Sequence, residues 1–198
     1  MSLGYPGRVV IGFHGCSREI AEKVLAGEEK LRPSENDFDW LGSGVYFWEF
    51  NFKRALQWAS KSRKGGEPYV IGAYIELKNC LDLISSDKLD ELQAAYQTLK
   101  TAYQKKGMPL PQNRRRIKST YIIRELDCQV IEAYKEISKN KGHEILSVRG
   151  VFWEGGHLYP GSSFRKQNHI QIAVNEKCVL GYFRPIELTA IRANRARP

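Results

Sequence analysis

The chain has 198 residues, of which 42% are hydrophobic and 27% are charged, the size and composition of one soluble globular domain. No apolar run approaches the roughly 20 residues that a membrane-spanning helix needs. The amino-terminal sequence MSLGYPGRVVIGFHG lacks the basic and apolar regions of a secretory signal. We therefore expect a single domain over residues 1–198, in the cytoplasm and without a membrane partner.

The net charge and the cysteines limit which partners, disulfides and metal sites the sequence indicates. The formal net charge is +9, which is compatible with a nucleic acid or another anionic partner but specific to neither. The densest basic cluster, at residues 114–118, fits a solvated loop or, as the alternative, a phosphate-binding patch. Without a CxxC pair, neither a disulfide framework nor a metal site is indicated. We predict free, mostly buried thiols for the four cysteines, Cys16, Cys80, Cys128 and Cys178.

The first half of the chain alternates strands and helices. RVVIGF at residues 8–13 is β-branched and aromatic, and it predicts a strand that ends at His14. We expect Ser17 to cap the following helix, which has apolar residues at helical spacing and ends at Gly27. Residues 31–44, LRPSENDFDWLGSG, then predict a loop long enough to carry function.

A second strand and a second helix follow this loop. Residues 45–48 predict a short strand, and Asn51 can cap the helix behind it. The helix face that we expect in the core holds Ala55, Trp58 and Ala59. Residues 69–77, YVIGAYIEL, are apolar like a strand at a sheet centre, with Gly72 marking a bulge or a close approach of another group.

The second half of the chain contains a helical insertion between strands. Helical patterns at residues 88–104 and 121–137 predict this insertion, at about residues 85–140. Its apolar stripe, which we expect to pack on the core or dock a partner, consists of Leu89, Leu92, Tyr96 and Leu99. The segment VRGVFWE (148–154) follows the insertion, and two strands are predicted at NHIQIAV (168–174) and CVLGYF (178–183). This order predicts the α+β fold class with an antiparallel-rich β-sheet core.

Polar residues beside glycines mark two candidate sites on the predicted strands. His14 lies between Gly12 and Gly15, where a ligand can approach the backbone. The simpler interpretation is a strand-end histidine with a turn glycine. In GSGVYFWE at residues 42–49, the glycines leave room for a planar group on which Tyr46 can stack. The simpler interpretation makes Tyr46 an ordinary strand aromatic.

The third candidate site lies on the predicted strand NHIQIAV. Side-chain alternation puts His169, Gln171 and Ala173 on one face of this strand. A glutamine on that face needs hydrogen-bond partners, which a ligand can supply. Water supplies them in the simpler interpretation, in which Gln171 lies at a sheet edge.

Taken in this order and spacing, the three sites resemble the ADP-ribosyltransferase superfamily, in its poly-ADP-ribose polymerase and diphtheria toxin branch. FHG at residues 13–15 and GSGVYF at residues 42–47 match two motifs of that branch, whereas Gln171 stands where a late-strand glutamate is usual. The resemblance covers about residues 8–77 and 148–184 and leaves the helical insertion outside. It implies a small, bacterial-type, single-domain member with the split β-sheet of this fold.

The resemblance also implies a binding site for NAD, which is consumed as a substrate. On that basis His14 hydrogen-bonds a ribose hydroxyl and the Gly15 backbone binds the nicotinamide carboxamide. Tyr46, beside Gly44, stacks on the nicotinamide ring. The glycine-rich loop at residues 155–163 falls where the family keeps its substrate-recognition loop.

Gln171 departs from the family pattern. In the family, the glutamate holds a hydroxyl of the nicotinamide ribose and favours an oxocarbenium-like transition state. A neutral glutamine keeps the hydrogen bond but not the charge. Three alternatives follow: Gln171 suffices for positioning, a carboxylate comes from Glu49 or Glu154, or the site binds NAD without turnover. Glu49 and Glu154 each follow a Phe-Trp pair.

These observations lead to competing hypotheses for function. The first is an NAD-dependent mono-ADP-ribosyltransferase that releases nicotinamide, as a bacterial toxin or defence effector with a neutralising partner protein. The net charge favours a nucleic acid acceptor slightly over a protein. The second is a catalytically inactive module that binds NAD, ADP-ribose or RNA on the same fold. A third, an RNA 2′-phosphate transferase, predicts basic residues around the first-strand motif, which GFHGC does not supply.

Overall fold

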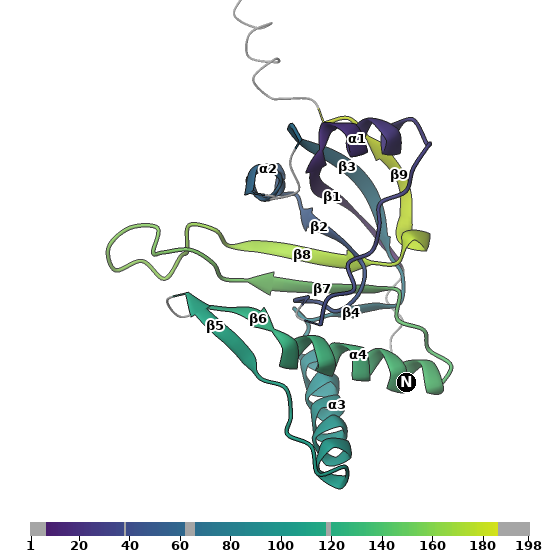
Figure 1. Cartoon of the computed structure of the whole chain (residues 1–198), viewed down its shortest axis with the longest axis vertical. Coiled ribbons are helices and arrows are strands. Elements are labelled where there is room, and N and C mark those ends of the chain that lie inside the picture. The colour runs from purple at the N-terminus through teal and green to yellow at the C-terminus, as the bar shows by residue number, and fades with distance from the viewer. Residues whose placement is uncertain (1–6, 38, 62–65, 118–119, 186–198) are drawn as a thin grey trace, which may run out of the picture.

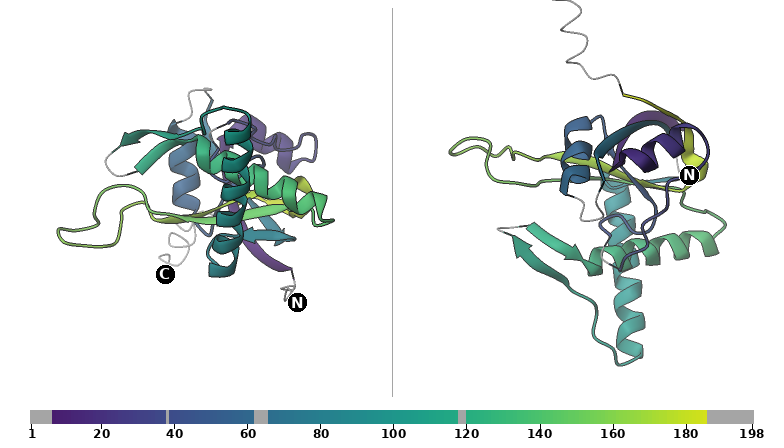
Figure 2. Two further views of the ribbon diagram at one scale, coloured as in Figure 1. Left: turned by 90° about the horizontal axis from the view of Figure 1, so that it is seen from below. Right: turned by 45° about the horizontal axis from the view of Figure 1, so that its top comes forward.

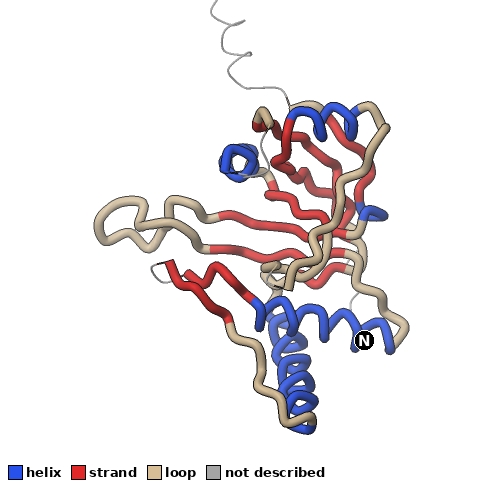
Figure 3. Tube along the Cα trace, in the orientation of Figure 1, coloured by secondary structure: helices blue, strands red, loops and turns tan. Residues whose placement is uncertain are grey.

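The computed structural model describes residues 7–37, 39–61, 66–117 and 120–185, and for residues 115–117 and 120–122 it describes the backbone alone. Helices and strands alternate through the first half of the chain, as expected (Figures 1 and 3). In chain order the elements are β1 (Arg8–Ser17), α1 (Arg18–Leu25), β2 (Val45–Glu49), α2 (Phe52–Lys61), β3 (Pro68–Leu77), β4 (Cys80–Asp82), α3 (Ser86–Lys105), β5 (Asn113–Ile117), β6 (Thr120–Arg124), α4 (Glu125–Asn140), β7 (Ser147–Phe152), β8 (His169–Val174), the 3-10 helix η1 (Glu176–Cys178) and β9 (Val179–Phe183).

One seven-stranded sheet organises the chain, in the order β4-β7-β8-β2-β1-β3-β9. Its strand pairs are antiparallel except for β4 with β7, which run parallel. The prediction of a mixed fold with an antiparallel-rich sheet is therefore confirmed. The strands that carry the three sequence motifs, β8, β2 and β1, are neighbours at the centre of this sheet.

Side-chain alternation along β2 divides the core between the two faces of the sheet. Val45 and Phe47 are fully buried in the cluster that also holds Ala21 and Val24 of α1. Tyr46 packs against a second cluster, which includes residues of α3 and α4, and Trp48 packs with α2 in a third. Helix α1 thus covers one face, and α2 and α4 cover the other (Figures 1 and 2).

The predicted helix caps are confirmed, whereas the predicted core face of α2 is wrong at one residue. Ser17 accepts a hydrogen bond from the Ile20 amide, and Asn51 accepts one from the Arg54 amide. Gly72 lies against a neighbouring group, because a Cβ there would come within 2.2 Å of the Phe183 ring. Trp58, expected in the core with Ala55 and Ala59, is 59% exposed, and its ring lies tilted beside that of Trp48, with centroids 5.8 Å apart.

The insertion is not wholly helical. The segment 121–124, expected to begin a helix, forms strand β6, which pairs with β5 in a separate two-stranded sheet. Helix α4 begins only at Glu125. In α3 most of the expected stripe faces the protein, since Leu92 packs against the second core cluster and Tyr96 and Leu99 are partly buried, but Leu89 is 48% exposed. Lys118 of the basic cluster lies outside the described residues.

The cysteines are free, as expected, with Cys128 and Cys178 buried and Cys16 and Cys80 partly buried. Within the described ranges, no group of three or more histidine, cysteine or carboxylate side chains is arranged to hold a metal ion. The helices of this described part are too short or too polar to cross a bilayer.

Candidate functional site

Strand β1 is paired very differently along its two edges. On one edge it pairs with β3 from Arg8 to Ser17, without interruption. On the other it pairs with β2 only at Gly12 and Phe13. The sheet therefore opens between β1 and β2 at the point where the chain reaches His14 and Gly15.

The direction of the backbone groups at this opening follows from strand geometry. The Phe50 amide donates to the Ile11 carbonyl at 3.0 Å, so the polar groups of Ile11 point toward β2. These groups alternate between the two edges of a strand, and those of Phe13 and Gly15 therefore point the same way. Continuing the β2 register would pair Gly15 with Tyr46, but the strands have separated there.

His14 replaces the missing backbone partner. Its Nδ1 lies 2.8 Å from the Tyr46 carbonyl oxygen, the acceptor that a continued ladder would give to the Gly15 amide. The imidazole meets the Phe47 ring edge to face, with centroids 5.7 Å apart. Because His14 takes the Tyr46 carbonyl, the N–H and C=O of Gly15 are left facing the opening together.

The protonation state of His14 follows from this contact. A carbonyl can only accept, so Nδ1 must carry the proton and donate it. Burial lowers the pKa of His14, although the bond to the Tyr46 carbonyl acts in the opposite direction. The ring is therefore neutral near pH 7, and its Nε2 is a hydrogen-bond acceptor.

Gly15 is also where α2 contacts the sheet. A Cβ at this position would lie 2.2 Å from the Ala55 carbonyl oxygen and 3.2 Å from the Ala59 nitrogen. Both are backbone atoms of α2, which cannot move aside as a side chain can. Only glycine lets the helix approach this closely and form one wall of the opening.

The Tyr46 side chain lies on one face of the sheet, and the side chains of His14 and Phe47 lie on the other. Its hydroxyl donates to the Gly42 carbonyl at 2.7 Å and accepts from the Leu41 amide at 2.8 Å. Burial raises the pKa of Tyr46, so the phenol remains protonated. The structure thus ties the tyrosine to its own preceding loop and packs its partly buried ring against the second core cluster.

The space beside Gly42 and Gly44 is filled by protein. A Cβ at Gly42 would lie 2.3 Å from a carboxylate oxygen of Glu132, and one at Gly44 would lie 3.0 Å from the Val174 nitrogen. Gly42 also has a φ of +73°, which side chains rarely adopt. These glycines admit α4 and β8 beside the loop, whereas the sequence suggested room for a ligand.

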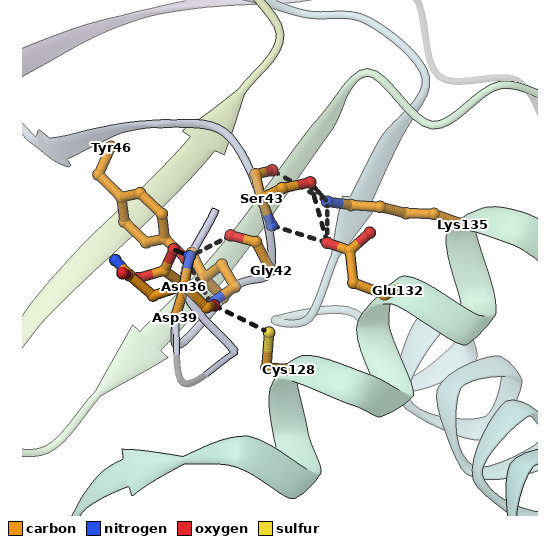
Figure 4. Close-up of polar contacts among 9 residues, drawn as sticks. Asn36, Asp39, Gly42, Ser43, Tyr46, Cys128, Glu132 and Lys135 are labelled. Atoms are coloured by element: carbon orange, nitrogen blue, oxygen red, sulfur yellow. Dashed lines mark hydrogen bonds and ion pairs between the residues drawn. The ribbon is translucent and has the colours of Figure 1, made fainter. Parts of the chain in front are cut away.

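A polar clasp joins this loop to α4, as Figure 4 shows. One carboxylate oxygen of Glu132 accepts from the Ser43 amide at 2.7 Å and from the Lys135 ammonium at 2.8 Å. Lys135 also donates to the Ser43 carbonyl at 3.0 Å. Burial works to raise the pKa of Glu132, but the bonds from Lys135 and Ser43 outweigh it and lower the pKa. The insertion thus fixes the loop that leads into Tyr46.

Asn36, earlier in the same loop, is held by one short-range bond and by one bond from α4. An Asp39 carboxylate oxygen accepts from the Asn36 amide at 2.9 Å, and the Cys128 thiol of α4 donates to the Asn36 carbonyl at 3.6 Å (Figure 4). Burial raises the pKa of Cys128 to about 11, so this thiol is a protonated donor and not a nucleophile.

Gln171 lies in one row with Trp48 and Gly150 on the neighbouring strands. Phe13 continues this row on β1, because it pairs with Trp48. Residues paired in this way share a face, so Gln171 lies on the side of the sheet that α2 covers. Its amide makes no hydrogen bond to the described part of the chain, and the buried Nε1 of Trp48 has no partner there either.

Glu154 lies on this same side, just beyond the end of β7. Its carboxylate accepts from the Arg54 guanidinium of α2 at 2.6 Å and lies 3.6 Å from Nδ1 of His169. His169 stacks on Phe152 and donates instead to the Gln167 carbonyl at 2.8 Å. Burial lowers the pKa of His169 to about 4, so this ring is neutral near pH 7.

Glu49 lies on the opposite face. Its carboxylate is held bidentately by Arg149, at 2.5 and 3.0 Å, and both side chains are only 9% exposed. Arg149 also contacts Asp82 of the adjacent strand β4 at 3.2 Å. This ion pair engages both oxygens of Glu49 on the face of the sheet opposite to Gln171.

The structure therefore brings some of the predicted residues together and separates others. His14, Gly15 and the Tyr46 backbone meet at the opening, and Gln171 and Glu154 share the α2 side of the sheet. Sequence reasoning did not single out Arg54, Arg149 or Glu132. Only the i, i+3 spacing of Glu132 and Lys135 gave a local signal, and it does not reveal that Ser43 is their partner.

Comparisons with known proteins give little guidance. No protein-family model and no solved structure matches the chain. Over 46 residues, the chain is 46% identical to the uncharacterized protein MJ0359 of Methanocaldococcus jannaschii. That match spans 23% of this chain and 21% of the archaeal protein. A functional assignment must therefore be argued from the geometry of the site.

Proposed function

We propose that the chain is an NAD-dependent mono-ADP-ribosyltransferase, with its nicotinamide site at the opening between β1 and β2. The observation that carries this proposal is the pair of backbone groups on Gly15, an N–H and a C=O directed toward the same opening. A primary carboxamide has one acceptor oxygen and an NH₂ donor side by side. The carboxamide of nicotinamide is therefore complementary to Gly15.

The neighbouring groups suit the remainder of the substrate. Nε2 of His14 is an acceptor next to Gly15 along the strand, and a ribose hydroxyl is a donor of matching chemistry. The contact of Nδ1 with Tyr46 holds the ring in one orientation and one tautomer, so this acceptor is preorganised. Tyr46 contributes its carbonyl, which fixes His14, while its ring packs against the second core cluster on the other face of the sheet, and the stacking expected from the sequence is not part of this proposal.

The proposed reaction breaks the bond between the nicotinamide nitrogen and C1′ of the ribose. The bonding electrons leave with nicotinamide, and a nucleophile of the acceptor bonds to C1′ and loses a proton. Positive charge develops on the ribose, which a nearby carboxylate stabilises. Glu154 lies on the side of Gln171 and binds Arg54 through one oxygen, whereas Glu49 lies on the side of His14 and binds Arg149 through both oxygens. Glu154, which keeps one oxygen free of Arg54, is therefore the better candidate.

Gln171 is assigned the positioning of the ribose through its amide. Its side chain has no partner in the described part of the chain, and it lies on the face of the sheet that also carries the Tyr46 ring, whereas the His14 ring lies on the other face. The proposed ribose contacts therefore reach through the opening between β1 and β2. A neutral amide provides less stabilisation than a carboxylate, at about tenfold in rate for each 1.4 kcal/mol. We therefore expect slow turnover, and we expect Gln171→Glu to raise the rate of nicotinamide release at least tenfold.

The test measures nicotinamide release from NAD by the purified chain with cell extract as the source of acceptor. His14→Asn places an amide donor near the position of Nδ1 but has no group at Nε2. We expect it to retain most of the stability and to lose nicotinamide release, whereas His14→Ala loses nicotinamide release and also about 1 kcal/mol of stability. Full activity in His14→Asn would rule out the assigned role of Nε2.

A separate measurement tests the carboxamide site itself. Nicotinamide titrated into the ¹⁵N-labelled chain should shift the Gly15 amide resonance, and nicotinic acid, which lacks the NH₂ group, should shift it much less. The second candidate function, an inactive NAD-binding module, is favoured by the neutral Gln171. It predicts the Gly15 shift together with no nicotinamide release, even in the Gln171→Glu variant.

A further inference from the structure

The connection between β7 and β8 is a preformed ribbon. Residues 153–168 form this ribbon, which is called the aromatic ribbon after its exposed rings. Backbone hydrogen bonds of 3.0 or 3.1 Å join its two sides, from Gln167 to Glu154, Lys166 to Gly156 and Leu158 to Phe164, with an isolated bridge between His157 and Arg165. The bond from the Ser162 amide to the Tyr159 carbonyl closes a turn at the tip. Figures 1 and 2 show that it extends well beyond the sheet. Its shape therefore does not depend on a binding partner.

The tip of the aromatic ribbon is also held by side chains. Ser162 is only 4% exposed, and its hydroxyl accepts from the Phe164 amide at 3.0 Å. Nδ1 of His157 bonds to the Ser162 carbonyl. These contacts use the polar groups near the tip to order the backbone, which keeps the neighbouring side chains in defined positions.

Large apolar side chains project from this ordered backbone into solvent. Their exposed fractions are 64% for Trp153, 53% for Leu158, 56% for Tyr159 and 62% for Phe164. Isolated exposed apolar residues are ordinary, but a group of three aromatic rings on one ribbon is a feature of binding surfaces. Ordering the rings in advance lowers the entropy that a partner must overcome.

The charges around these rings are positive. Arg165 and Lys166 follow Phe164 directly, and they form no ion pair with the described residues. The acidic residue of the ribbon, Glu154, is neutralised by Arg54 at 2.6 Å. The β5–β6 hairpin extends from the same end of the molecule in Figures 1 and 2, and its Arg114 is paired with Glu125. A polyanion is therefore the complementary partner.

We propose that the aromatic ribbon binds single-stranded nucleic acid. Unpaired bases stack on the rings of Tyr159 and Phe164, and Arg165 and Lys166 contact the phosphates between them. A duplex does not fit this scheme, because its bases already stack on one another. Binding by the ribbon is independent of NAD chemistry. The ribbon leads into β8, which carries Gln171, so the bound strand can be the acceptor of ADP-ribose. Only this acceptor role rests on the proposed transferase function.

The test uses the full chain without NAD and follows the fluorescence polarisation of labelled 12-nucleotide DNA and RNA strands. We expect Tyr159→Ala and Phe164→Ala each to weaken binding about fivefold to a hundredfold. Matched controls are Trp58→Ala and Leu180→Ala, which remove side chains that are 59% and 56% exposed on other elements. These controls should bind like the unaltered chain, and Lys166→Ala should reduce the dependence of binding on salt.

Two results would overturn the proposal. One is single-strand binding that is unchanged in the Tyr159→Ala, Phe164→Ala double variant, or that equals duplex binding. The other is absence of single-strand binding together with self-association that the double variant abolishes, which would make the aromatic ribbon an interface between copies of the chain. Nicotinamide release is measured separately, so failure of the ribbon and failure of the nicotinamide site are distinguishable.

Discussion

The two edges of β1 present the same backbone chemistry and yet differ completely in pairing. Toward β3 the ladder is unbroken from Arg8 to Ser17, while toward β2 it stops after Phe13. The difference begins at His14, whose ring takes the Tyr46 carbonyl that the next ladder bond would use. One side chain can therefore open a sheet locally by replacing a backbone donor.

The comparison also explains why the opening does not simply collapse. Gly15 allows α2 to lie directly against β1, and Glu132 holds the loop on the β2 side. The opening is thus supported by one close backbone contact and one polar clasp, from elements distant in sequence. Unpaired backbone groups at such a place are costly unless a ligand or water satisfies them, which is why we assign them a binding role.

The largest effect is expected from Gly15→Ala. Because the added Cβ would lie 2.2 Å from the Ala55 carbonyl oxygen, α2 must move away from β1. We expect a loss of about 3 kcal/mol in the free energy of unfolding, measured by urea denaturation. Gly181→Ala is the control, since a Cβ there meets nothing within 4 Å. Equal stability of the two variants would show that α2 does not depend on Gly15.

Acid should weaken the structure, because one histidine on each face of the sheet is held as a neutral ring. The folded-state pKa of His169 is lowered to about 4, and that of His14 is also lowered. The unfolded chain therefore binds protons first as the pH falls below about 6.5, and stability is lost from there toward pH 4. We expect a loss of about 2 kcal/mol between pH 6.5 and 4.5.

Urea denaturation of His169→Phe across this pH range separates the two histidines. The variant keeps a ring against Phe152 but removes the titrating group at residue 169. Most of the acid dependence should disappear, and the remaining part belongs to His14 and the opening. An undiminished dependence in His169→Phe would show that His169 does not titrate as its burial indicates.

A smaller effect is expected from Glu132→Gln, which loosens the β2 side of the opening. The variant replaces the charge that accepts from Ser43 and Lys135. We expect a loss of about 1 to 2 kcal/mol in unfolding free energy and weaker nicotinamide binding. Glu19→Gln is the control, because its ion pair with Lys23 is exposed and should contribute almost nothing. If Glu132→Gln bound nicotinamide as tightly as the unaltered chain, the polar clasp would not be needed for the nicotinamide site.

The smallest effect on stability should distinguish two substitutions of His14. His14→Ala leaves the Tyr46 carbonyl without its donor, and we expect a cost of about 1 kcal/mol. His14→Asn keeps a donor and should cost less than half as much. Hydrogen exchange of the Gly15 amide then shows whether β2 has moved back onto β1 in His14→Ala, since closing the ladder would slow exchange at Gly15 alone. An equal cost for both variants would mean that the Nδ1 contact does not hold the opening.

The sequence by itself determined the local features of this protein. Ser17 and Asn51 begin the expected helices because their side chains bond to amides three residues on, and alternation correctly placed Gln171 and His169 on one face. The three sequence motifs also mark β1, β2 and β8, which are neighbours in the sheet. Such features depend on residues close together in the chain.

Only the tertiary structure decided which of these residues can act together. His14 was expected at the end of a strand, but β1 continues to Ser17 because β3 pairs with it throughout. Trp58 is exposed because Ala55 and Ala59 are the side chains small enough for α2 to lie on Gly15. Glu49 forms its ion pair with Arg149, a residue 100 positions later in the sequence. Contacts of this kind depend on packing between distant segments, which local patterns do not encode.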